Sequence, residues 1–167
     1  MSLLVYGFKP YADYKENISE KVIAEIPGSD RVRKAVFDIR FSRRMFAAVL
    51  QRSSPDVIIG LGQHPRARKL RIERKAVNLW KNGNMGPKSI APLGPKYRYS
   101  NLGLPLTSEV TVAYDAGSYL CNYSMYVVAE YCERHAARFA FIHVPQNYKL
   151  AKVTRYVCHA MDAILLE

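Results

Sequence analysis

A cysteine at the turn of a strand–turn–helix pattern is the residue in this chain best placed to act as a nucleophile. Glu109–Tyr114 is short and β-branched, which predicts a strand, whereas Tyr119–Glu133 carries apolar residues at helical spacing. Cys121 therefore falls at the start of the helix, where unpaired backbone N–H groups and the helix dipole favour a thiolate. The alternative is a small buried hydrophobic residue that fills a gap between helix and sheet.

A histidine follows this helix at the end of the next predicted strand. Arg138–His143 is a largely apolar run, and His143 stands at its carboxyl end. Because one helix separates Cys121 from this strand, the two side chains can meet at the same edge of a sheet. A cysteine beside a histidine is the pairing that activates a thiol for acyl transfer. The alternative for a histidine on an apolar strand is a core residue with satisfied hydrogen bonds.

The rest of the chain alternates apolar strands with amphipathic helices. This alternation predicts one α/β domain over residues 1–167, a three-layer α/β/α sandwich with a mostly parallel central sheet. Sites in such folds gather at the carboxyl ends of the strands. Further strands are expected at Leu3–Phe8, Val32–Ile39 and Asp56–Gly62, and further helices at Ser19–Ile26, Ser42–Arg52 (with Ser42 as N-cap) and Tyr148–Leu166.

The middle of the chain has a different character. Leu70–Leu79 is expected to be extended, and Trp80–Leu106 is rich in glycine, proline and asparagine, which predicts a long irregular loop. A loop of this length inside a compact domain is usually functional or mobile. We therefore expect it to act as a lid or as a contact between subunits.

Composition and charge limit the classes of partner. The formal net charge is +11, and several of the basic residues cluster within Arg66–Lys75. No nucleic-acid-binding motif accompanies the cluster, so we expect a solvated basic face and no specific nucleic acid partner. No apolar run approaches the roughly 20 residues that span a bilayer, so no membrane partner is expected. The absence of a signal peptide and of a disulfide framework predicts a cytoplasmic protein.

Two segments around the candidate nucleophile and base resemble motifs of the pyroglutamyl peptidase I family, the pyrrolidone-carboxylate peptidases. Asp115–Asn122, sequence DAGSYLCN, fits the family's cysteine motif, although Ala113 stands where that motif begins with serine. Phe141–Pro145, sequence FIHVP, matches the family's histidine motif in full.

Two further segments resemble the family in the expected order along the chain. Gly7–Tyr11 matches an N-terminal G-F-x-P-[FY] motif. Leu70–Asn78 keeps the glutamate, arginine, alanine and asparagine of the family's glutamate motif but departs from it at Arg71 and Lys75. Family members are longer and carry an arginine-bearing D-A-R-I-P-like stretch after the asparagine, and this chain lacks that stretch after Asn78.

The resemblance implies a cysteine peptidase that removes N-terminal pyroglutamate by acyl transfer. Cys121 would attack, His143 would move the proton and Glu73 would orient the imidazole, with backbone N–H groups near Cys121 stabilising the oxyanion. No metal or other cofactor is expected. The resemblance also implies a homo-oligomer, a dimer or tetramer. The alternative is a divergent, catalytically weak homologue that binds a peptide or polyanion through its basic face.

The resemblance also implies where the substrate would bind. Phe8 and Tyr11 would enclose the flat, uncharged lactam ring, since aromatic faces provide apolar contact without a charge. Gln63 would hydrogen-bond the lactam, because an amide can both donate and accept; a core residue for Phe8 and a surface residue for Gln63 are the alternatives. Tyr119 and Leu120, just before the cysteine, would add specificity. His64 is expected to be a loop residue and not a metal ligand.

Overall fold

The first strand, β1 (Leu3–Phe8), is buried along its whole length in the computed structural model, which describes residues 1–167. Successive side chains of a strand point to opposite faces of a sheet. Leu3 and Val5 accordingly join one apolar cluster, whereas Leu4 and Tyr6 join the other. The sheet therefore has a hydrophobic core on each of its faces.

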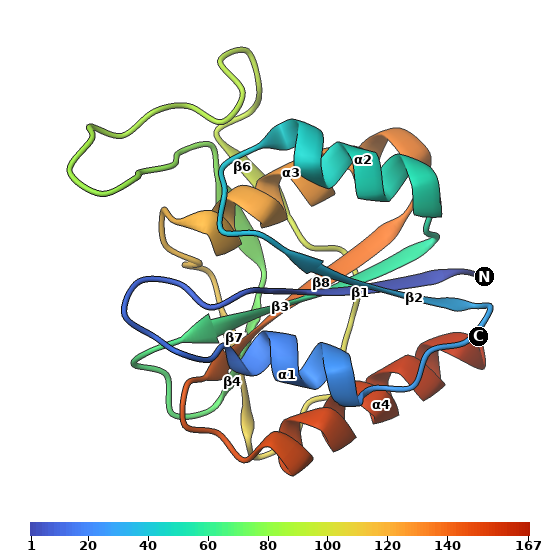
Figure 1. Ribbon diagram of the computed structural model, residues 1–167. Coiled ribbons are helices and arrows are strands. Elements are labelled where there is room, and N and C mark those ends of the chain that lie inside the picture. The colour runs from blue at the N-terminus through green and yellow to red at the C-terminus, as the bar shows by residue number, and fades with distance from the viewer.

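Helices cover both faces of this sheet. In Figure 1, α2 and α3 lie above it and α1 and α4 below it, which confirms the expected three-layer α/β/α sandwich. The elements in chain order are β1 (Leu3–Phe8), α1 (Ile18–Glu25), β2 (Val32–Phe37), α2 (Arg43–Ser53), β3 (Val57–His64), β4 (Leu70–Glu73), β5 (Lys75–Val77), β6 (Tyr97–Tyr99), β7 (Val110–Ala113), α3 (Leu120–His135), β8 (Arg138–Pro145) and α4 (Leu150–Leu165).

The main sheet has the strand order β2-β1-β3-β8-β4-β7. Strands β2, β1, β3 and β8 are parallel, β4 pairs antiparallel with β8, and β7 is parallel to β4. The expectation of a mostly parallel sheet is confirmed, with β4 and β7 running against the other four strands. The antiparallel register places Arg71 opposite His143 and Glu73 opposite Phe141.

The helix starts differ in how they are capped. The Ser42 hydroxyl accepts a hydrogen bond from the Met45 N–H at the start of α2, as expected of an N-cap, and the Asn17 side chain accepts one from the Ser19 N–H at the start of α1. Tyr119, the N-cap of α3, forms no such side-chain bond. The helix that carries Cys121 therefore begins with backbone donors left available.

The expectation of one extended segment over Leu70–Leu79 is wrong. The chain breaks at Arg74 into β4, in the main sheet, and β5, which pairs with β6 in a separate two-stranded sheet. The Arg74 backbone N–H and side chain donate to the carbonyls of Ala113 and Leu102. These bonds hold the chain at the point where it leaves one sheet for the other.

Strand β6 lies inside the stretch that was expected to be irregular throughout. Tyr97 and Tyr99 are exposed, and Arg98 between them is buried against Glu130 and Glu133 of α3. A strand with one buried face is normally recognised by apolar residues at alternate positions. Here the buried position holds an arginine neutralised by carboxylates, so the sequence lacks the alternating apolar residues that indicate a strand.

The long loop is fixed at its base by Asn78. The Asn78 side chain accepts from the N–H groups of Ile90 and Ala91, and donates to the carbonyls of Ala91 and Gly94. The backbones of Trp80 and Lys88 also bond to each other in both directions. The loop extends away from the sheet at the upper left of Figure 1. Its role as a lid or subunit contact stays a prediction. None of the four helices has both the length and the apolar character needed to cross a membrane.

Candidate active site

Glu73 and His143 form a buried pair across two neighbouring strands. The Glu73 carboxylate oxygen Oε1 lies 2.8 Å from His143 Nδ1. The Glu73 side chain is 0% exposed, and His143 is also buried. A carboxylate in contact with one imidazole nitrogen fixes the ring orientation and favours the protonated imidazolium. The other ring nitrogen, Nε2, is left for a reacting group.

A glycine on a neighbouring strand leaves room for the Cys121 sulfur beside this pair. Gly62 on β3 is paired in register with His143 on β8. A Cβ atom built on Gly62 would lie only 2.5 Å from Cys121 Sγ, so the sulfur occupies the space above this glycine. The structure thus brings Cys121, His143 and Glu73 together from α3, β8 and β4.

The protonation of His143 follows from this arrangement. Burial acts to lower the pKa of His143, but its interactions with Cys121 and with Glu73 outweigh burial and raise the pKa to about 9. His143 is therefore an imidazolium at neutral pH. An imidazolium next to a half-buried sulfur is the environment in which a cysteine acts as a nucleophile.

The start of α3 offers hydrogen-bond donors to a developing oxyanion. Neither the Leu120 N–H nor the Cys121 N–H donates a hydrogen bond within the chain. Gly117 adopts a positive φ of 79°, and its N–H donates to Asp115 Oδ1, which shapes the turn before the helix. Two free donors at a helix N-terminus, next to a nucleophile, can stabilise negative charge on a carbonyl oxygen.

Asn122 holds this helix start in place, a role that we did not infer from the sequence. Its side chain accepts from the Val77 N–H and donates to the carbonyls of Val77 and Leu79. It thereby ties the residue after Cys121 to β5 and to the residues that directly follow β5. The only sequence signal was its place in the cysteine motif, directly after Cys121.

The aromatic candidates for substrate binding are placed differently from each other. Phe8 is only 2% exposed and packs against Tyr6 and Phe37 within the core beneath α2 and α3. Tyr11 is half-buried in the loop after β1. Burial raises the pKa of Tyr11 to about 12, while its contact with Gln63 acts in the opposite direction. Tyr11 thus lies next to Gln63, whereas Phe8 is a buried core residue.

Gln63 has a structural partner on one side and none on the other. Its Oε1 accepts from the Ile18 N–H at the start of α1, at 2.9 Å. Its Nε2 is buried and has no hydrogen-bond partner. Gln63 therefore caps a helix with its oxygen and can still donate to a ligand through its nitrogen.

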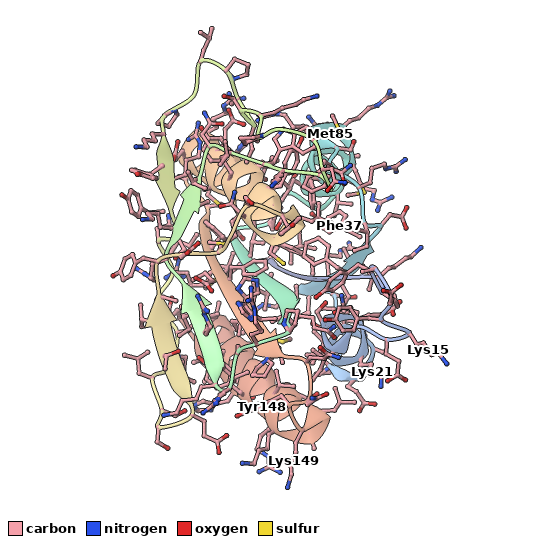
Figure 2. The ribbon with its side chains drawn as sticks, turned by 90° about the vertical axis from the view of Figure 1, so that its left-hand side faces the viewer. Lys15, Lys21, Phe37, Met85, Tyr148 and Lys149 are labelled. Atoms are coloured by element: carbon pink, nitrogen blue, oxygen red, sulfur yellow. The ribbon has the colours of Figure 1, made fainter.

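Gln63 also lines a cavity of about 420 Å³ on the α1 and α4 side of the molecule. Figure 2 looks onto the side of the molecule that lies at the left of Figure 1. The labelled Lys15, Lys21 and Tyr148, which also line the cavity, lie in its lower part, beside α1 and α4. The cavity is bordered by both polar and apolar side chains.

The two residues before Cys121 lie in different surroundings. Tyr119 is 61% exposed, so its ring is free to contact a ligand. The Leu120 side chain is buried in the core beneath α2 and α3. Leu120 therefore reaches the site through its backbone N–H and not through its side chain.

Two residues that we did not assign to the site also belong to it. His64 is the last residue of β3 and not a loop residue, and its ring centroid lies 5.1 Å from that of His143. Arg71 Nε lies 3.0 Å from Glu73 Oε1. A usable signal existed for both, because residues two apart on a strand share a face: His64 with Gly62, and Arg71 with Glu73.

Comparison with known sequences finds one family. A model described as pyroglutamyl peptidase matches residues 97–154. A pyrrolidone-carboxylate peptidase of Saccharolobus islandicus is 27% identical over 176 residues, covering 90% of this chain and 82% of the relative. One from Halalkalibacterium halodurans is 28% identical, covering 89% of this chain and 86% of the relative.

Comparison with solved structures finds the same fold. A mutant pyrrolidone carboxyl peptidase from Pyrococcus furiosus matches with a TM-score of 0.86 at 24% identity, over 99% of this chain and 98% of that one. The pyroglutamyl peptidase I of Bacillus amyloliquefaciens matches with a TM-score of 0.83 at 23% identity, over 95% of this chain and 92% of that one. At these identities the likeness establishes the fold.

Proposed function

We propose that this chain is a divergent member of the pyroglutamyl peptidase family and a cysteine peptidase that removes N-terminal pyroglutamate from peptides. The observation that carries the proposal is the convergence of Cys121, His143 and Glu73 at one edge of the sheet. These three side chains supply the nucleophile, the proton carrier and the group that orients it, which are the side-chain roles that acyl transfer requires.

The reaction follows from the geometry. The Cys121 thiolate attacks the carbonyl carbon of the pyroglutamyl residue, and the oxyanion is stabilised by the N–H groups of Leu120 and Cys121. The C–N bond then breaks, and the His143 imidazolium gives its proton to the leaving amine. Neutral His143 next takes a proton from water, which attacks the thioester, releases pyroglutamate and regenerates the thiol. Glu73 stabilises the imidazolium whenever it forms.

Recognition of the lactam is assigned to the groups around Gln63. The free Gln63 Nε2 can donate to the lactam carbonyl, and the half-buried Tyr11 ring can cover one face of the lactam. Tyr119 can contact the substrate from the side of α3. Phe8 is buried in the core against Tyr6 and Phe37 and is assigned no contact with the lactam.

A pair of fluorogenic amides tests this function. We expect the protein to release aminomethylcoumarin from pyroglutamyl-aminomethylcoumarin and not from the prolyl amide, which has a charged amine and no ring carbonyl. Equal release from the two amides, or none from either, would contradict the proposed function.

The substitution Gln63→Glu tests whether Gln63 recognises the lactam ring. Glutamate keeps an oxygen to accept from the Ile18 N–H but removes the amide donor, so α1 stays capped while a lactam contact is lost. Leaving a buried hydrogen-bonding group unpaired costs about 1–3 kcal/mol, so we expect kcat/KM for the pyroglutamyl amide to fall by about 10- to 100-fold. Cys121 should still be alkylated, but at higher pH than in wild type, because the added carboxylate disfavours a neighbouring thiolate. Loss of both would show that Gln63 is structural only.

We also propose that the chain forms a homo-oligomer and acts in the cytoplasm. Support for an oligomer comes from exposed apolar side chains at the β7 edge of the sheet and on β6, namely Val112, Tyr114, Tyr97 and Tyr99. The three unpaired cysteines, one of them the nucleophile, suit a reducing compartment. Light scattering of the purified protein should give at least twice the 19.0 kDa of one chain. A single 19 kDa species would contradict the oligomer.

A further inference from the structure

Arg71 lies on the strand that carries Glu73 and points to the same face of the sheet. It is two residues before Glu73 on β4 and directly opposite His143 in the antiparallel register. Its side chain is 26% exposed, whereas that of Glu73 is fully buried. Arg71 therefore stands between the buried pair and the solvent.

The guanidinium of Arg71 contacts three parts of the site. Its Nε lies 3.0 Å from Glu73 Oε1 without the alignment of a hydrogen bond, so this contact is electrostatic. One terminal nitrogen donates to the Asp115 carbonyl at 3.0 Å, in the turn before Cys121. The other lies 3.4 Å from His64 Nε2. A single cation thus joins the carboxylate, the nucleophile's turn and the end of β3.

The charges of the reactive state explain why a cation is needed here. With a Cys121 thiolate, a His143 imidazolium and a Glu73 carboxylate, the three groups carry a net charge of −1 in a largely buried place. An uncompensated buried charge is costly. Adding the Arg71 guanidinium brings the sum to zero.

No other facing group provides this compensation. Burial, together with the charges of His143 and Arg71, lowers the pKa of His64, so it is neutral at neutral pH. Burial raises the pKa of Tyr6 and of Tyr11, so both are neutral as well. The Asp115 carboxylate accepts from the Gly117 N–H and is exposed. Arg66, in the turn after β3, is exposed and forms no ion pair.

We propose that Arg71 is a positioning residue that balances the charge of the reactive triad and ties the turn before Cys121 to Glu73. The inference rests on the proposed function, since it assigns Arg71 a part in the same reaction. This role of Arg71 predicts a change in the pH dependence of the Cys121 reaction. Loss of the thiol proton leaves a negative charge that Arg71 stabilises, so removal of the Arg71 charge should move this step to higher pH.

The test is the rate of Cys121 alkylation by iodoacetamide, measured by mass spectrometry from pH 5 to pH 9. Arg71→Gln keeps a donor for the Asp115 carbonyl but removes the charge. We expect its alkylation midpoint to lie at higher pH than that of wild type, because the thiolate loses a compensating positive charge. Arg71→Lys should stay close to wild type. Arg68→Gln, which removes an exposed charge nearby, is the matched control and should change nothing.

The alkylation profiles of these variants show whether the inference about Arg71 holds. An Arg71→Gln profile that overlies that of wild type, or an equal shift in Arg68→Gln, would overturn the inference. If Arg71→Gln does not fold, Arg71→Lys tests the inference instead. A pH midpoint of Cys121 alkylation in Arg71→Lys above that of wild type would overturn the inference, because this variant keeps the charge. Because alkylation uses no substrate, a wild-type protein that leaves pyroglutamyl amides intact would count against the proposed function and not against the part assigned to Arg71.

Discussion

Replacing Cys121 with alanine should abolish amine release from a pyroglutamyl amide and leave the fold intact. The sulfur is half-buried above Gly62 at the first turn of α3, so its removal opens little core space. The proposed reaction loses its nucleophile. Removal of a catalytic nucleophile typically costs about 10⁴-fold or more in kcat. Steady-state kinetics, with circular dichroism as the check on folding, measure the loss.

The other two cysteines provide the matched controls. Burial raises the pKa of Cys132 to about 12 and also raises the pKa of Cys158. Neither thiol is therefore prepared for reaction at neutral pH. Cys158→Ala should keep wild-type activity, and iodoacetamide should label Cys121 well ahead of both. Full activity in Cys121→Ala, or uniform labelling of the three thiols, would remove the catalytic assignment and leave only the fold.

His143→Ala should cause a comparable loss, and the pH profile of the wild type carries the same information. The pKa of His143 is raised from its ordinary value to about 9. The imidazolium that gives a proton to the leaving amine is present below this pH and is lost as the pH rises through it. We expect kcat/KM to decline above about pH 9 and to show no such limb near pH 6.5.

Gly62→Ala should also lower the rate strongly, although it changes no reactive group. The new methyl group would lie 2.5 Å from Cys121 Sγ and 2.9 Å from the Phe141 ring. Phe141 is fully buried and cannot yield, so the sulfur must move away from His143. Misplacement of a reacting atom by about 1 Å can cost about 100-fold in rate. We expect kcat to fall by at least that factor and alkylation of Cys121 to slow.

Gly28→Ala is the control for this substitution. No atom lies within 4 Å of the position that its Cβ would take. The two alanine variants therefore differ only in what the added methyl group meets. Overpacking of a core costs about 1–3 kcal/mol, so thermal unfolding should show a modest loss of stability in Gly62→Ala and none in Gly28→Ala. A Gly62→Ala protein with wild-type kinetics would show that the sulfur does not depend on this space.

The sequence predicted those parts of the site that depend on local pattern. Cys121 and His143 could be placed because a strand, a turn and a helix each have a short-range signature, and parallel strands end at one edge. Glu73 was assigned only through the family resemblance. Its position next to His143 results from the antiparallel pairing of β4 with β8, and residues 73 and 143 have no local pattern in common.

The features that the sequence did not predict also depend on contacts between distant segments of the chain. β6 was missed because its buried residue, Arg98, is charged, and the carboxylates that neutralise it belong to a helix more than thirty positions later. Arg71 was interpreted only as a departure from a motif. Its spacing of two residues from Glu73 indicates a shared face of the strand, but nothing near it in the sequence shows that its side chain also meets His64 and Asp115. Long-range pairing of charges is the information that a local pattern does not contain.

The bonds between Trp80 and Lys88 have a consequence for how the length of this loop can vary. They close the outer part of the loop upon itself, and Asn78 fixes the stretch that follows. The closure entropy of such an excursion grows only slowly with the number of residues in it. Residues 82–87 can therefore be lengthened or shortened at small cost, while Asn122 continues to hold β5 and the nucleophile helix in register. Insertions at the tip of this loop can therefore add new contacts without moving the proposed catalytic residues.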